Sequence, residues 1–138
     1  MFSTRLSMPQ FGAAYGVALL AMIVLDGLWL GVIALPFYKQ EIGSLMLDTP
    51  RWLPAAMFYL FYPLGLVFLA LYMPPASLME AALRCAVVGL VAYGVYDLSN
   101  LATLKGWSVK IAVVDILWGT FASGLAGTLA YLMARRIS

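Results

Sequence analysis

Histidine is absent from the 138 residues, and cysteine occurs once, at Cys85. The chain therefore lacks the commonest general base and the commonest transition-metal ligand, and it has no disulfide framework of its own. Charged residues are also scarce, at 10% of the sequence against roughly 25% in soluble domains. The net charge of +2 is small and scattered along the chain, which does not favour nucleic acid as a partner.

Hydrophobic residues are correspondingly abundant, at 64% against about 45–50% in soluble proteins. They form four long apolar runs, and about 20 helical residues suffice to cross a bilayer. The sequence therefore predicts an all-α integral membrane four-helix bundle with short loops, in a single transmembrane domain over residues 1–138. The predicted spans cover residues 12–35, 53–73, 81–104 and 109–133.

The breaks between these runs carry charges, glycine or proline. Residues 36–52 are predicted to form a loop with room for a short interfacial helix, and Pro63 is expected to kink the second span. Residues 105–108 connect the last two spans so tightly that these must be antiparallel neighbours. A cleaved signal peptide is the competing interpretation of the first run. Its apolar region would be only about 7–15 residues, without an internal Asp26.

Basic residues divide equally between the two ends of the predicted bundle, so the positive-inside rule gives no majority. One end has Arg5, Arg84, Arg135 and Arg136, and the other has Lys39, Arg51, Lys105 and Lys110. The terminal arginines lie directly against span ends, while Glu41 and Asp48 share the other end. We therefore predict that both termini are cytoplasmic.

Aspartates occur at a similar depth in three of the four predicted spans. From the helical rise, Asp26, Asp97 and Asp115 each lie about 9–12 Å from the same membrane side. Tyr59 and Tyr62 of the second span lie about 9–14 Å from that side. A carboxylate in hydrocarbon costs roughly 2.5–3.5 kcal/mol and needs a partner, a proton or water. We therefore expect these groups to face inward in one layer.

Helical spacing adds further groups to this layer. Asp97 and Asn100 lie three residues apart on one face. Residues 24–29 and 113–118 are alike, and each has an aspartate three residues before a tryptophan, which favours a paired device over chance similarity. The predicted ligand-binding residues are Asp26, Trp29, Tyr59, Tyr62, Asp97, Asn100, Asp115 and Trp118.

Small residues at steps of three or four permit close approach of membrane helices. Two such faces are predicted, Gly119–Ser123–Gly127 in the last span and Gly16–Gly27–Gly31 beside Asp26 in the first. Packing alone would explain these ladders. Solvation from the nearby loops would likewise explain Asp97 or Asp115 without a functional cluster.

Residues 97–107, with Val114-Asp115 and Trp118-Gly119 after them, resemble an uncharacterised family of small bacterial membrane proteins, classed as a domain of unknown function. Residues 26–29 fit the same pattern, and Ser99 stands where threonine is expected. The resemblance covers nearly the whole chain. It implies a bacterial inner-membrane protein of four helices, without any established catalytic residue.

Three functions remain open. An intramembrane binding or transport protein would take a proton, a cation or a cationic amphiphile at the acidic and aromatic layer, and a homodimer is then expected because four helices seldom enclose a path. A lipid-modifying enzyme or its accessory would use paired carboxylates as acid and base, or hold Mg²⁺ or Ca²⁺ through oxygen ligands. A structural or assembly protein would only satisfy the acids by hydrogen bonds.

The partners follow from these alternatives: the lipid bilayer, a small cation or lipid-like ligand, and no nucleic acid. No cofactor can be named from the sequence. Without a bound cation, at least one of the three aspartates is expected to carry a proton at neutral pH, because three ionised carboxylates in a small apolar volume repel one another.

Overall fold

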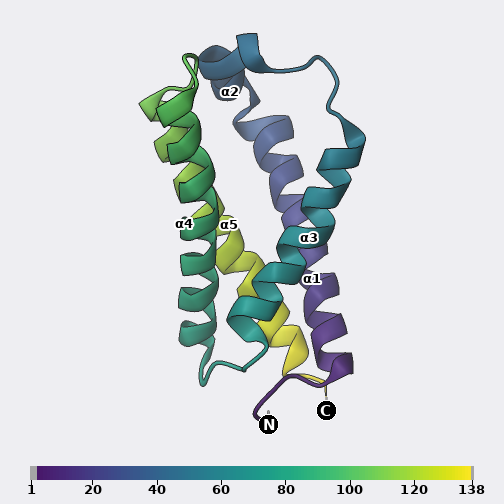
Figure 1. Cartoon of the computed structure of the whole chain (residues 1–138). Helices are drawn as coiled ribbons and strands as arrows, with labels where there is room; N and C mark the ends of the chain where they lie inside the picture. Colours follow the sequence, from purple (N-terminus) through teal and green to yellow (C-terminus); the bar gives the residue numbers. More distant parts are fainter. Residues whose placement is uncertain (1–2, 138) are drawn as a thin grey trace.

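The computed structural model describes residues 3–137, and over this range the chain forms helices and no strand. The five α-helices are α1 (Met8–Leu28), α2 (Leu35–Ile42), α3 (Trp52–Leu71), α4 (Leu78–Thr103) and α5 (Val109–Ala134). A π-helical segment, Trp29–Ile33, prolongs α1, and a 3₁₀ turn, Gly43–Leu45, follows α2. Figure 1 shows the long helices side by side as a bundle.

Four of these helical segments are long and apolar enough to cross a membrane: Met8–Ile33, Trp52–Leu71, Leu78–Thr103 and Val109–Ala134. The predicted all-α membrane bundle is therefore confirmed. A fifth helix, α2, lies between the first two spans, in the segment where the sequence left room for a short helix. Pro36 lies in the first turn of α2, where proline is compatible with a helix.

Serine caps decide where three of the long helices begin. The Ser7 hydroxyl accepts a hydrogen bond from the Gln10 backbone (3.2 Å), and the Gln10 side chain accepts one from the Ser7 backbone (2.9 Å). This capping box starts α1 four residues before the predicted span. The Ser77 and Ser108 hydroxyls each accept a backbone hydrogen bond at the start of α4 and α5, at 3.1 Å. Polar caps therefore start α1 and α4 before the predicted apolar runs, whereas α5 begins at the predicted Val109.

The two ends of the described chain meet at one end of the bundle (Figure 1). The Gln10 side-chain amide donates a hydrogen bond to the Ile137 carbonyl (2.8 Å), and the Leu6 amide donates one to the Tyr72 carbonyl (2.9 Å). We call this the terminal end, and the end with α2 the α2 end. The hydrogen bonds join the start of α1, the end of α3 and the end of α5.

Helices α4 and α5 approach closely through small residues. A methyl group added at Gly119 would lie 2.1 Å from the Tyr93 ring, and one at Gly127 would lie 2.1 Å from the Cys85 sulfur. From the other side, a methyl group at Gly89 would meet the Gly119 carbonyl at 2.5 Å. The predicted close approach at Gly119 and Gly127 is thus confirmed.

The corresponding prediction for α1 is wrong. Gly27 and Gly31 are exposed, and a methyl group added at either position, or at Gly16, would meet no atom within 4 Å. The buried face of α1 instead follows steps of four residues: Gln10, Ala14, Ala18, Met22 and Asp26. Alanine already allows close approach here, and Met22 fills the space against Ala122 and Ala126 of α5.

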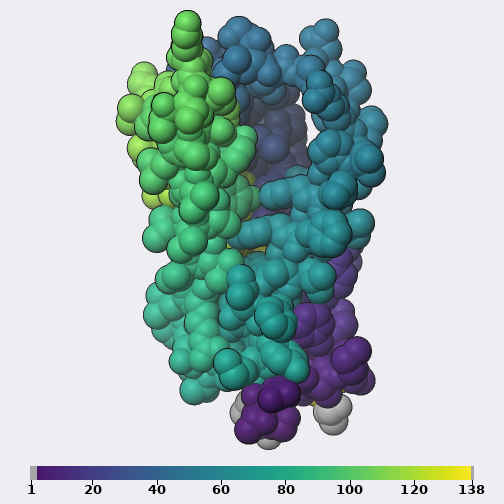
Figure 2. Space-filling model, viewed as in Figure 1, coloured from purple at the N-terminus to yellow at the C-terminus, as the bar shows by residue number. Residues whose placement is uncertain are grey.

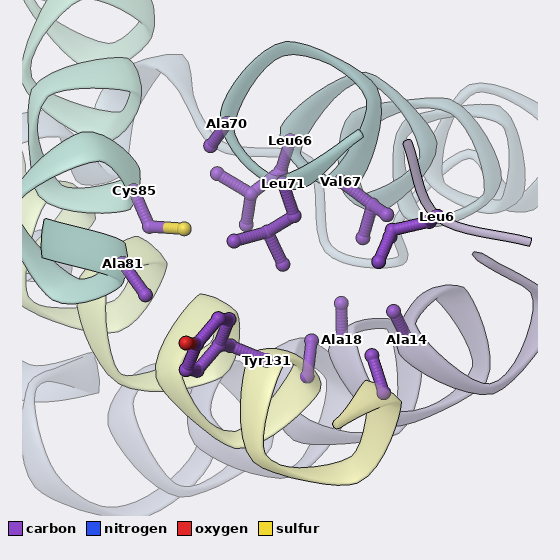
Figure 3. Packing of buried hydrophobic residues seen from close by; sticks show 12 residues of the cluster. Leu6, Ala14, Ala18, Leu66, Val67, Ala70, Leu71, Ala81, Cys85 and Tyr131 are labelled. Carbon is purple, nitrogen blue, oxygen red and sulfur yellow. The ribbon is translucent and has the colours of Figure 1, made fainter. Parts of the chain in front are cut away.

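The terminal end is packed and the α2 end is open. Figure 3 shows the buried cluster at the terminal end, where side chains of α1, α3, α4 and α5 meet around Leu66, Leu71 and Tyr131. Helix α3 continues through Pro63, and its buried residues all lie from Pro63 onward. Its first half, from Trp52 to Tyr62, is exposed or half-buried. Figures 1 and 2 show α3 diverging from α4 towards the α2 end.

Gly127→Ala should lower the free energy of unfolding by about 1–3 kcal/mol, the usual effect of overpacking a tight contact. Gly16→Ala is the matched control, because the added methyl group meets open space and alanine is the better helix former. Unfolding by sodium dodecyl sulfate, followed by circular dichroism, measures the difference. Equal stability of the two variants would contradict the close α4–α5 contact.

Candidate functional site

A cavity of about 620 Å³ lies in the open half of the bundle. Helices α1, α3, α4 and α5 all contribute to its wall. The lining residues are Asp26, Trp29, Leu30, Pro54, Ala55, Phe58, Tyr59, Tyr62, Ala92, Tyr93, Tyr96, Asp115 and Trp118. Figure 2 shows a hollow between the teal α3 and the green α4, so this cavity opens towards the side of the bundle.

Asp26 joins three helices at the floor of this cavity. Its side chain is 5% exposed and projects from the buried face of α1. One carboxylate oxygen accepts a hydrogen bond from the Tyr59 hydroxyl of α3 (2.8 Å), and the other accepts one from the Trp118 indole of α5 (3.0 Å). Two neutral donors therefore stabilise a carboxylate that lies within a span.

Asp115 is held from the α2 end by a second network. Its Oδ1 atom accepts a hydrogen bond from the Tyr38 hydroxyl (2.9 Å), and that hydroxyl accepts one from the Trp29 indole (3.2 Å). Tyr38 is a buried residue of α2, and burial raises the pKa of its hydroxyl group above the ordinary value. The hydroxyl therefore remains protonated at neutral pH and donates to Asp115.

The indoles of Trp29 and Trp118 stack, with ring centroids 4.5 Å apart and planes 4° apart. Each serves the aspartate of the opposite helix: Trp118 of α5 bonds Asp26 of α1, and Trp29 reaches Asp115 of α5 through Tyr38. The two similar sequence segments thus pair crosswise on antiparallel elements. The π-helical turn begins at Trp29 and carries its indole at the end of α1.

Tyrosines of α3 and α4 complete the aromatic wall. The hydroxyls of Tyr62 and Ser123 are 2.6 Å apart and share a hydrogen bond. The Tyr62 ring stacks on Phe58 at 5.7 Å and contacts Tyr93 edge-on at 6.0 Å. These contacts make the cavity wall largely aromatic, with hydroxyls at several depths.

Asp97 lies outside the cavity lining. It is fully buried on α4, and neither of its carboxylate oxygens has a hydrogen-bond partner among residues 3–137. Its carboxyl group faces that of Asp115 on α5. The Trp107 indole also lies near Asp97, although its nitrogen does not meet the geometry of a hydrogen bond.

Six of the eight predicted site residues line the cavity, and Asp97 and Asn100 do not. Asn100 lies on α4 beside Tyr96, half-buried. Asp26 and Asp97 are buried, whereas Asp115 is only half-buried because it borders the cavity. The three aspartates are therefore distributed between a cavity wall and an adjacent buried position.

The predicted ligand-binding residues do not include Tyr38, Phe58, Tyr93 and Tyr96. Tyr93 lies four residues before Asp97 on the helical stripe of Asp97 and Asn100, which is visible in the sequence. Tyr38 has no comparable signal, because it lies outside the predicted spans and its bond to Asp115 crosses 77 residues of sequence.

No basic side chain of the described residues lines this cavity. Among residues 3–137, the one ion pair within 4 Å joins Arg84 and Glu80, at 3.4 Å. No group of three His, Cys, Asp or Glu side chains in the described range could hold a metal ion. The carboxylates therefore have neutral hydrogen-bond donors as neighbours, and no arrangement typical of an acidic metal centre.

The fold defines the class of the chain as a helical membrane protein, and its bundle encloses a largely aromatic cavity. The chain belongs to the family described as "Predicted membrane protein (DUF2177)", whose model matches residues 11–132. This match includes every predicted site residue and confirms the resemblance to a family of unknown function. No curated protein and no solved structure matches the chain.

Tyr38→Phe should lower the free energy of unfolding by about 1–3 kcal/mol, because it leaves Asp115 without its donor and Trp29 without its acceptor. Tyr15→Phe is the matched control, since its hydroxyl bonds only the Leu60 carbonyl. Tyr15→Phe should lower the free energy of unfolding by about 0.6 kcal/mol, the average contribution of a hydrogen bond between membrane helices. Detergent unfolding curves compare the variants, and a larger effect at Tyr15 would contradict the assigned network.

Proposed function

We propose that the protein binds a lipophilic cation in the cavity between α3 and α4. The observation that carries this proposal is the pair of carboxylates, Asp26 and Asp115, on one aromatic cavity without a basic partner. A ligand of this kind has a positively charged centre and an apolar body. The site then serves either capture of such a compound or its passage through the membrane.

Charge balance is the first support. Asp26 and Asp115 receive hydrogen bonds from hydroxyl and indole groups, which spread the negative charge without cancelling it. Attraction between opposite charges is stronger where the effective dielectric constant is low. The carboxylates would therefore attract a cation between them more strongly than carboxylates at a water-exposed surface would.

The aromatic wall is the second support. The faces of Trp, Tyr and Phe attract cations, and desolvated contacts of this kind contribute about 2 kcal/mol or more. The stacked pair Trp29 and Trp118 lines the cavity together with both carboxylates, and Tyr59, Tyr62 and Tyr93 line it as well. A cavity of about 620 Å³ lies within the range of roughly 300–1,000 Å³ that holds drug-sized ligands.

The position of the opening supports a lipophilic ligand. The hollow faces sideways between two spans (Figure 2), and large exposed apolar side chains such as Phe61, Phe68 and Leu69 cover the outside of α3. Such a surface suits hydrocarbon. A ligand dissolved in the bilayer would reach the carboxylates without first crossing the water-facing end of the bundle.

A structural role is the second candidate, and one observation favours it. Both oxygens of Asp26 are already hydrogen-bonded, so this side chain can join α1, α3 and α5 without any ligand. Under this alternative the cavity would hold lipid tails. Removal of the Asp26 charge would then change the stability of the protein, and any association of cations with the protein would not depend on Asp26.

We further propose a bacterial inner membrane location with both termini cytoplasmic. The terminal arginines Arg5, Arg135 and Arg136 directly flank α1 and α5, whereas the acidic Glu41 and Asp48 lie near the α2 end. For transport, a homodimer is proposed, because four spans seldom enclose a complete path. Capture of a ligand at the cavity does not require this second copy.

Purified protein in lipid nanodiscs should bind tetraphenylphosphonium, and Asp26→Asn should weaken this binding at least about tenfold, equivalent to about 1.4 kcal/mol. Asparagine keeps the size and can still accept the Trp118 hydrogen bond, so the change removes mainly the charge. Quenching of tryptophan fluorescence measures binding, since Trp29 and Trp118 line the cavity.

Two controls sharpen this experiment. Tetraphenylborate has nearly the same shape with a negative charge and should not compete. Asp48→Asn removes an exposed carboxylate outside the site and should bind as the unmodified protein does. Binding no stronger than that of empty nanodiscs, or equal affinity in Asp26→Asn, would reject cation binding and support the structural role.

Single cysteines test the proposed orientation in a Cys85→Ala background. Ser44→Cys, at the α2 end, should react with a membrane-impermeant maleimide on intact bacterial spheroplasts. Ser3→Cys and Ile137→Cys should react only after the membrane is opened. Labelling of the terminal positions on intact spheroplasts would reverse the orientation, and labelling of only one would refute a common side for the termini.

A further inference from the structure

Asp97 is the buried ionisable group that the proposed binding site does not use. It is 0% exposed, and both its oxygens lack a hydrogen-bond partner in the described chain. A carboxylate in this condition would lose its hydration without any compensation. The side chain faces the Asp115 carboxyl group, which itself borders the cavity.

The groups around this pair are neutral or acidic. Tyr38 of α2 and Tyr96 of α4 lie near both Asp97 and Asp115, and Tyr38 is hydrogen-bonded to Asp115. Asp26 of α1 and Tyr93 of α4 lie near Asp115. None of these side chains supplies a positive charge.

One proton shared with Asp115 would give Asp97 a hydrogen-bond partner and remove the repulsion between two ionised carboxylates. Two adjacent carboxylates repel one another strongly in an apolar environment, so such pairs hold one proton between them. The shared proton forms a hydrogen bond between the two carboxyl groups and gives Asp97 the partner it otherwise lacks. The pair then has a single negative charge, stabilised by the Tyr38 hydroxyl on Asp115.

We propose that Asp97 and Asp115 share one proton while the cavity is empty, and that a lipophilic cation bound beside Asp115 displaces this proton. The step breaks one O–H bond of the pair, releases the proton to water and leaves both carboxylates ionised, with Asp115 beside the cation and Asp97 behind it. One positive charge therefore replaces another. This inference rests on the proposed cation site and adds exchange to it.

Proton release per bound cation tests the exchange. Tetraphenylphosphonium is added to the protein in nanodiscs in a weakly buffered solution, and a pH indicator reports the protons released. The unmodified protein should release close to one proton per cation bound. Its affinity should rise about tenfold per pH unit while the pair holds its proton, because protons and cations compete.

Asp97→Asn separates exchange from binding. The amide can donate a hydrogen bond to Asp115 and keep it ionised, so this variant should still bind the cation, release no proton and show little dependence on pH. Asp48→Asn is the control and should behave as the unmodified protein. Proton release that persists in Asp97→Asn would overturn the assignment to this pair.

Infrared difference spectroscopy provides a measurement that does not depend on any variant. A protonated carboxyl stretch should be present in the empty protein and disappear when tetraphenylphosphonium saturates it. Binding without loss of this band, and without proton release, would refute exchange and leave the cation site standing. No binding at all would refute the cation site, and the exchange with it.

Discussion

Negative charge within membrane spans is the constraint on which the rest of this structure depends. A basic side chain would offset it most directly, but Asp26 and Asp115 have hydroxyl and indole donors instead. Those donors come from α2, α3, α5 and the end of α1, so satisfying two aspartates draws most of the elements together. The same aromatic side chains thus stabilise the carboxylates and hold the helices of the bundle together.

One stacked pair of indoles, Trp29 and Trp118, contributes to the hydrogen bonds of both aspartates. A stack of two indoles presents one N–H group to each acidic network and leaves ring surface towards the cavity. The glycine contacts between α4 and α5 have the complementary role, because they hold the wall that presents Asp115 and Asp97. Rigid packing at one end of the molecule thus supports a polar, incompletely filled space at the other.

Sequence reasoning recovered the features that depend on local pattern. Apolar length predicted the four spans, and the depth of the aspartates predicted that they would face the interior of the bundle, where Asp26 and Asp97 are buried. It failed where a partner lies far along the chain: Tyr38 meets Asp115 across 77 residues, and no local period marks it. It also failed at Gly27 and Gly31, because small residues permit close packing without requiring it, and alanines already supplied the contact surface of α1. The depth of Asp97 was predicted, but not its separation from the cavity, which depends on how α4 and α5 are rotated.

Helix α3 is packed against the bundle along only one of its halves, and this bears on which ligands the cavity would accept. This helix is buried only from Pro63 onward, so the half that carries Phe58 and Tyr59 has no packed layer behind it. Outward movement of this half would break the Tyr59–Asp26 hydrogen bond but would leave the cluster around Leu66 and Leu71 in place. For the proposed cation binding, we therefore expect weak discrimination by ligand size and strong discrimination by charge.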